Sequence, residues 1–99
     1  MTKIVIRKDQ NGAYRQVICS GHAGYANAGK DIVCAAVSSI VITTINALLK
    51  LDKDSVSYKN SLEITIHKHN EVIDILIGNM LDMLKELEKD YKKYIKVEI

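Results

Sequence analysis

The sequence of 99 residues contains no proline, no low-complexity tract and no linker rich in glycine or serine. Such features usually mark the boundaries between domains, so nothing in this chain divides it. A chain of this length can bury one core of modest size, which removes roughly 60–65% of the unfolded chain's surface from water. We therefore expect residues 1–99 to form a single domain.

Cysteine and unbalanced charge are also scarce. The two cysteines, Cys19 and Cys34, show no further pattern and do not make a disulfide framework, which favours a reducing compartment. Fourteen basic residues against twelve acidic ones give a formal net charge of +2. A protein that binds nucleic acid usually carries a basic patch or stripe, and the nearest feature of that kind here is the group Lys92, Lys93 and Lys96. A solvated helix end accounts for most of these lysines, so we expect no direct contact with nucleic acid.

Charge is absent altogether from Ile32 to Leu49, a stretch close to the lower length limit of a membrane span. Serine, threonine and asparagine interrupt the stretch, Asp31 and Lys50 bracket it, and no second span exists. We therefore expect no membrane span. A buried helix is the better interpretation, with part of its surface available to a homodimer interface. Met1 leads directly into an alternating strand, so we expect no signal peptide and a cytoplasmic protein.

Hydrophobic periodicity predicts an α+β fold, a single-domain sandwich of a mostly antiparallel sheet with two helices. The dipeptide Asn11-Gly12 predicts a two-residue turn in the first hairpin. The expected strands cover Thr2–Lys8, Tyr14–Ser20, a weak one within Asp52–Ser57, Leu62–Lys68 and Tyr94–Ile99, and the expected helices cover about Ile32–Leu49 and Glu71–Tyr91. The residues expected to face the core in the last two strands are Leu62, Ile64, Ile66, Ile95, Val97 and Ile99.

The segment from Gly21 to Ser38 carries most of the chemistry. His22 lies in a glycine-punctuated loop, and Cys34 follows just inside the start of the predicted helix. A cysteine becomes a strong nucleophile as its thiolate, which a nearby imidazole and the positive end of a helix both favour. Cys34 and His22 together therefore indicate a thiolate nucleophile with its base.

Asp31 is a favoured N-cap residue, which would place Cys34 in the first helical turn. The amides of that turn could stabilise a thiolate and act as an oxyanion hole. Ser38 lies one turn further on, where its hydroxyl could bond to the Cys34 carbonyl or serve only as a small packing residue. Asp31 could also orient His22, but a carboxylate occupied in capping is poorly free to do so, and we assign it a supporting role.

The loop between His22 and Asp31 is suited to closing over a ligand, because its glycines can adopt left-handed conformations. Its larger side chains could contact a bound peptide. The residues expected in this substrate loop are Gly24, Tyr25, Asn27 and Gly29. The plain alternative is that Cys34 is a buried packing cysteine and His22 an ordinary loop residue, since free cysteine behaves as a small hydrophobe. From the residues alone, the two interpretations are nearly balanced.

The run GHA, a variable loop and then G-x-D-I-V-C-A-x-V-S resembles the ribosomal-processing cysteine proteases of bacteria, and the resemblance extends over the whole chain. The matching positions are Gly21, His22, Ala23, Gly29, Asp31, Ile32, Val33, Cys34, Ala35, Val37 and Ser38. The resemblance implies a Cys/His dyad, with Cys34 as nucleophile and His22 as base, Gly21 in support, and no cofactor. It also implies a homodimer that removes the N-terminal extension of the precursor of large-subunit ribosomal protein twenty-seven, cutting after an aromatic residue.

Other interpretations remain open at this point. A non-catalytic homodimer associated with ribosome assembly would leave Cys34 merely buried. An acyltransferase would also use the thiol, and a redox sensor would need Cys19 as its resolving cysteine. His67 and His69 share the spacing of two metal ligands on one strand face, but no third ligand is visible nearby, so we expect exposed histidines and no metal site.

Overall fold

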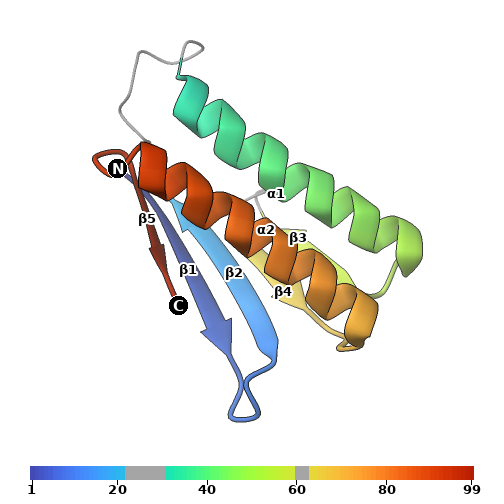
Figure 1. Cartoon of the computed structure of the whole chain (residues 1–99). Coiled ribbons are helices and arrows are strands. Elements are labelled where there is room, and N and C mark those ends of the chain that lie inside the picture. The colour runs from blue at the N-terminus through green and yellow to red at the C-terminus, as the bar shows by residue number, and fades with distance from the viewer. Residues whose placement is uncertain (22–30, 60–62) are drawn as a thin grey trace.

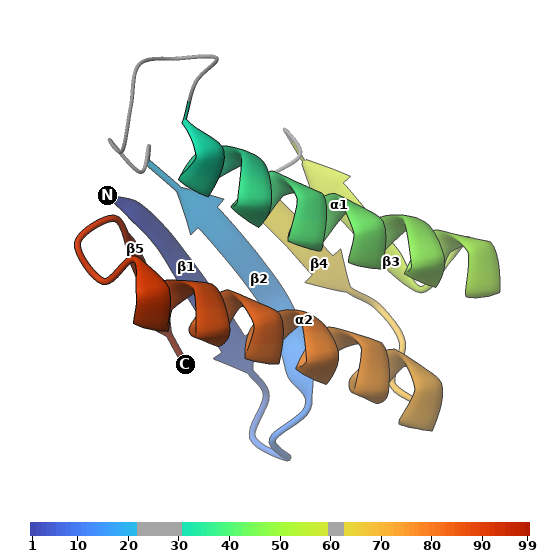
Figure 2. The same ribbon diagram turned by 45° about the horizontal axis from the view of Figure 1, so that its top comes forward.

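The computed structural model describes residues 1–21, 31–59 and 63–99. A five-stranded sheet forms one layer, and two helices cover one of its faces (Figure 1). In the turned view both helices lie in front of the sheet (Figure 2). The elements in chain order are β1 Thr2–Lys8, β2 Tyr14–Ser20, α1 Ile32–Leu51, β3 Val56–Lys59, β4 Glu63–Ile66, α2 Glu71–Asp90 and β5 Ile95–Glu98.

The strand order is β3-β4-β2-β1-β5. Strand β1 pairs antiparallel with β2, β2 with β4, and β4 with β3, whereas β1 and β5 run parallel. The predicted α+β fold with a mostly antiparallel sheet is confirmed. The parallel pair places the N-terminal strand in the interior of the sheet, so that β1 lies between β2 and β5 and Thr2 pairs with Ile95 of β5.

The core lies between the sheet and the helices. Alternate strand residues are buried there, as a half-buried strand requires, and the helices contribute the residues that recur at three- and four-residue steps. The predicted inward residues Ile64, Ile66 and Ile95 are buried, and Val97 is partly buried. Ile99 was wrongly expected to face the core, because β5 ends at Glu98 and Ile99 is 61% exposed. Leu62 lies outside the described residues.

The first hairpin differs from the prediction. Lys8 pairs with Tyr14 after a register shift, so residues 9–13 form the connection instead of a two-residue turn at Asn11-Gly12. The Asp9 carboxylate organises this loop by accepting from the amides of Asn11 at 2.8 Å and Ala13 at 3.1 Å. Local hydrogen bonding by an aspartate therefore outweighs the Asn-Gly preference.

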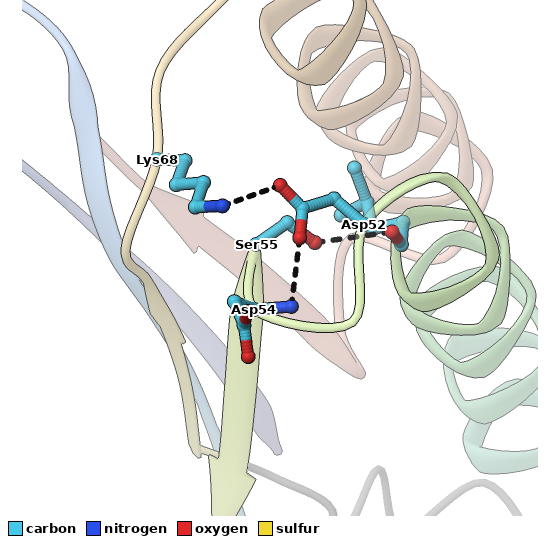
Figure 3. A network of polar contacts seen from close by, with 5 residues as sticks. Asp52, Asp54, Ser55 and Lys68 are labelled. Atoms are coloured by element: carbon cyan, nitrogen blue, oxygen red, sulfur yellow. Dashed lines mark hydrogen bonds and ion pairs between the residues drawn. The ribbon is translucent and has the colours of Figure 1, made fainter.

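The weak strand expected within Asp52–Ser57 begins later, at Val56. Asp52 caps the end of α1 and its carboxylate accepts from the Asp54 amide at 2.9 Å and from the Lys68 ammonium at 2.7 Å (Figure 3). The buried hydroxyl of Ser55 donates to the carbonyl of Leu48 at 3.0 Å. These bonds fold residues 52–55 back against the helix end, so the strand begins only at Val56.

Helix α1 is buried along one stripe only. Its core residues are Val33, Val37, Val41, Ile45 and Leu48. Ile32, Ile42 and Leu51 are 55%, 46% and 58% exposed, so the expected burial of this helix is observed on one face alone. By length and composition, α1 is the one helix of the described chain that could cross a membrane.

Candidate active site

Cys34 lies in the first turn of α1, and Asp31 holds that turn. One oxygen of the Asp31 carboxylate, Oδ1, accepts from the backbone amides of Val33 and Cys34, each at 3.0 Å. The backbone of Asp31 is extended, as an N-cap requires. The predicted cap and the predicted position of the cysteine are both confirmed. The thiol of Cys34 therefore lies near the positive end of a helix of 20 residues.

The same bonds limit which amides of the first turn could form the expected oxyanion hole. The amides of Val33 and Cys34 are committed to the Asp31 carboxylate, and the Ala35 amide donates to the Asp31 carbonyl at 3.1 Å. These three donors cannot bind a developing oxyanion without losing the cap. The helix end can stabilise negative charge through its dipole, but direct donors must come from other groups.

Cys34 opens onto a pocket of about 230 Å³. The pocket lies where the start of β1 and the end of β2 meet the first two turns of α1, and it brings together residues from three elements. The lining residues are Thr2, Cys19, Ser20, Gly21, Cys34, Val37 and Ser38. Cys34 itself is only partly buried, so its sulfur is neither sealed in the core nor fully in water.

Thr2 lines the pocket although nothing in the sequence pattern marked it as a site residue. Its hydroxyl oxygen Oγ1 lies 3.9 Å from the Sγ atom of Cys34, within reach of a long hydrogen bond to sulfur. Thr2 is 4% exposed, and its backbone amide donates to the Tyr94 carbonyl at 2.8 Å. No sequence signal could have revealed this contact, because it joins residues 32 positions apart where the first turn of α1 meets the start of β1.

Gly21 closes the pocket at the end of β2. Its φ is +79°, and an added Cβ atom would overlap the backbone carbonyl oxygen of Met1. The position therefore demands glycine on both grounds. The proposed base His22 follows directly, and it lies outside the described residues, as do Gly24, Tyr25, Asn27 and Gly29.

Ser38 and Cys19 share the pocket with Cys34. The Ser38 side chain makes no hydrogen bond to any residue that the structure describes, so the proposed bond to the Cys34 carbonyl is absent there. Burial raises the pKa of the Cys19 thiol to about 11. Cys19 therefore stays protonated at neutral pH, which suits packing and not attack on an oxidised Cys34.

The two histidines at the end of β4 have separate partners. Nε2 of His67 lies 2.7 Å from the Ser57 hydroxyl, and Nδ1 of His69 lies 4.0 Å from the Asp74 carboxylate. Within residues 1–21, 31–59 and 63–99, no three His, Cys, Asp or Glu side chains gather as a metal site would require.

A larger hollow of about 490 Å³ lies beside the end of α2. It brings Lys92 and Lys96 together with Lys85 and Lys89 around Met1, Glu88 and Ile95. The residues that line this hollow include no cysteine, serine or histidine, so they offer no thiol or hydroxyl nucleophile and no imidazole base. The chemistry of the described chain therefore centres on the smaller pocket at Cys34.

Known proteins resemble this chain over nearly its whole length. The model of a family described as cysteine protease Prp matches residues 1–96. The ribosomal processing cysteine protease Prp of Staphylococcus aureus is 26% identical over 103 residues, covering 98% of this chain and 97% of that protein. The Prp of Bacillus subtilis is also 26% identical, covering 98% and 96%.

Solved structures give the same picture. A crystal structure of an essential ribosomal processing protease Prp from S. aureus, with a covalently linked product peptide, superposes with a TM-score of 0.88 at 26% identity. The superposition covers 99% of this chain and 98% of the S. aureus chain. A second S. aureus structure, with a substrate peptide, gives a TM-score of 0.83 at 25% identity with the same coverage.

Proposed function

Because the chain belongs to the cysteine protease Prp family and is a cysteine protease, we propose that Cys34 is its nucleophile and His22 its general base. The observation that carries the proposal is the position of Cys34. It is partly exposed, it lies in the first turn of a capped helix, and it lines a pocket that residues from β1 and β2 complete.

The reaction follows from the chemistry of the two groups. His22 takes the thiol proton, and Sγ of Cys34 attacks the scissile carbonyl carbon to form a tetrahedral oxyanion. As the C–N bond breaks, His22 returns the proton to the leaving amine and a thioester remains on Cys34. Water then attacks the thioester and gives its proton to His22, and the C–S bond breaks to release the carboxylate and the thiol.

The field of α1 supports the charged states of this cycle. The positive end of the helix favours both the thiolate and the oxyanion that forms next to it. Asp31 supports the site by fixing the turn that carries Cys34, and Gly21 supports it by allowing the chain to pass Met1 just before His22. Ser38 borders the pocket, where it would face a bound peptide. The expected substrate loop at Gly24, Tyr25, Asn27 and Gly29 would then close over that peptide.

For the substrate, we propose the precursor of large-subunit ribosomal protein twenty-seven, whose N-terminal extension the enzyme removes after an aromatic residue. The relatives are ribosomal processing proteases, and two S. aureus structures contain a substrate peptide and a covalently linked product peptide, which supports this substrate class. We further propose that residues 1–99 act as one protease domain, in the cytoplasm, and as a homodimer. The exposed Ile42 on α1 and Tyr58 on β3, at 46% and 57%, support a second copy packing on that side.

The test is cleavage of a peptide that carries the extension and the mature N-terminus of this ribosomal protein. The native chain, Cys34→Ala and His22→Ala are compared, and mass spectrometry locates the cut. A single cut after an aromatic residue by the native chain, lost in both folded variants, supports the proposal. Cleavage by Cys34→Ala at the native rate contradicts the nucleophile. Activity in His22→Ala within about tenfold of native contradicts the base, whose removal should cost a hundredfold or more.

A further inference from the structure

Thr2 is a buried polar residue whose side chain meets the sulfur of the nucleophile. Buried hydroxyls in native proteins almost always have a hydrogen-bond partner. Among the described residues, the one side-chain partner of Thr2 is Sγ of Cys34, 3.9 Å from Oγ1. No buried side-chain oxygen or nitrogen in the described chain lacks a partner, so the contact accounts for this hydroxyl.

The sheet holds Thr2 in place. The Thr2 amide donates to the Tyr94 carbonyl, and its Cα pairs with that of Ile95 in the parallel ladder of β1 and β5. The hydroxyl therefore approaches Cys34 from a rigid strand, whereas Asp31 holds the helix turn from the other side. A donor on a rigid element is already oriented when charge develops, which is what makes such a donor effective.

The direction of the effect follows from the two possible donors. A thiol is a weak donor, so the bond from S–H to the Thr2 oxygen adds little to the neutral form. Once the proton has left, the hydroxyl donates to a full negative charge, and hydrogen bonds to charged groups are about twice as strong. The backbone amides of Val33 and Cys34 cannot replace this donor, because the Asp31 carboxylate occupies them.

We propose that Thr2 is a positioning residue of the active site, whose hydroxyl stabilises the thiolate of Cys34 and holds its sulfur at the pocket. The proposal rests on the proposed function only in taking Cys34 as the nucleophile. It adds a third element to the site, since the strand that supplies Thr2 is separate from the loop of His22 and from helix α1.

The test measures the rate at which iodoacetamide alkylates Cys34 as a function of pH, with peptide mass spectrometry to separate Cys34 from the buried Cys19. Thr2→Val keeps the side-chain shape and removes the hydroxyl, and Thr2→Ser keeps the hydroxyl. Thr44→Val is the matched control, because its hydroxyl donates to the Ile40 carbonyl at 3.1 Å on the same helix, away from the pocket. Intact mass confirms that all variants share the same N-terminus.

Loss of one hydrogen bond to a thiolate should move the midpoint of the pH–rate curve up by about half to one unit. We expect that shift in Thr2→Val and not in Thr2→Ser or Thr44→Val. At a pH below the midpoint, kcat for peptide cleavage by Thr2→Val should be about three- to tenfold lower than native, with KM unchanged. An unchanged midpoint in folded Thr2→Val overturns the proposal, as does an equal shift in Thr44→Val.

Alkylation needs no peptide substrate, so the two proposals can fail separately. If Cys34→Ala does not cleave the peptide and Thr2→Val has the native alkylation midpoint, the proposed protease mechanism is supported and the proposed role of Thr2 is contradicted. If Thr2→Val unfolds at 25 °C, Thr2→Ala and Thr2→Ser provide the same comparison, and the hydroxyl is then judged by whether Thr2→Ser alone retains the native midpoint.

Discussion

Gly21 packs against the backbone of Met1 so closely that a Cβ atom at position 21 would overlap the Met1 carbonyl oxygen. This relationship ties the end of β2 to the very start of the chain. Thr2, which follows Met1, lines the same pocket as Gly21 and Cys34. The packing of Met1 and Thr2 against the end of β2 is therefore part of the architecture of the candidate active site.

The first prediction concerns Gly21→Ala. A left-handed φ costs a residue with a side chain roughly 1–2 kcal/mol, and the overlap with Met1 adds to that cost, so we expect a larger loss in the free energy of unfolding and a clear loss of peptide cleavage. Gly12→Ala is the matched control, because Gly12 has a φ of +82° but nothing within 4 Å of an added Cβ. Urea unfolding and cleavage rates are the measurements. Equal losses in the two variants would show that the Met1 contact is unimportant.

The second prediction separates the two roles of Asp31. Replacing a capping aspartate or asparagine by alanine costs about 1 kcal/mol, so Asp31→Ala and Asn70→Ala should lower stability by similar amounts. Asn70 caps α2 by accepting from the Ile73 amide at 2.9 Å, far from Cys34. We expect cleavage to fall at least tenfold in Asp31→Ala and to stay near native in Asn70→Ala. Similar activity in both variants, measured well below their melting temperatures, would reduce Asp31 to a stability residue.

The arrangement of elements was largely predictable because periodicity and capping act locally. Both first strands have the predicted bounds, and α2 ends one residue before Tyr91, which is its C-cap. The predicted strand and turn positions were wrong where a short polar side chain forms hydrogen bonds with nearby backbone groups in place of strand pairing. Asp9 lengthens the first hairpin loop, and Asp52 draws the next segment back to α1 before β3 can begin.

Features of the site that depend on neighbouring residues were predictable, whereas contacts between residues far apart in the sequence were not. Asp31 as cap and Cys34 in the first turn follow from neighbouring residues, and both are confirmed. The contact of Thr2 with Cys34 depends on how α1 lies against the start of β1, a long-range feature that helix and strand patterns do not specify. The competition between capping and an oxyanion hole could not be predicted either, since only the folded structure shows that Oδ1 of Asp31 accepts from both amides.

The third prediction tests the proposed homodimer. The pocket of about 180 Å³ between α1 and β3 is lined by Ile42, Ile45, Asn46 and Tyr58. A charge in a buried subunit contact is costly when unpaired, so Ile42→Lys should shift the protein to monomers in sedimentation velocity at micromolar concentration. Ile75→Lys is the control, because Ile75 is 61% exposed on α2. A native chain that is already monomeric, or dissociation by Ile75→Lys alone, contradicts this interface.

The fourth prediction concerns acid stability and the ion pair that joins the end of α1 to the segment after β4. The hydrogen bond from Lys68 and the amide of Asp54 lower the pKa of the Asp52 carboxyl below its usual 3.8. The unfolded state therefore binds a proton first as the pH falls, and the stability that this pair provides at neutral pH is lost below about pH 4. Asp52 in turn raises the pKa of Lys68, so the same contribution is also lost at strongly alkaline pH, above about 10.5.

Lys68→Met should therefore lose less unfolding free energy than the native chain between pH 7 and pH 3, measured by urea titration. Lys53→Met is the matched control, because it removes a neighbouring positive charge that makes no ion pair within the described residues. The difference should be small and should shrink in 0.5 M salt, since the pair is partly exposed to solvent and screened. If Lys53→Met reproduces the effect of Lys68→Met, the general charge near Asp52 is responsible and not the ion pair.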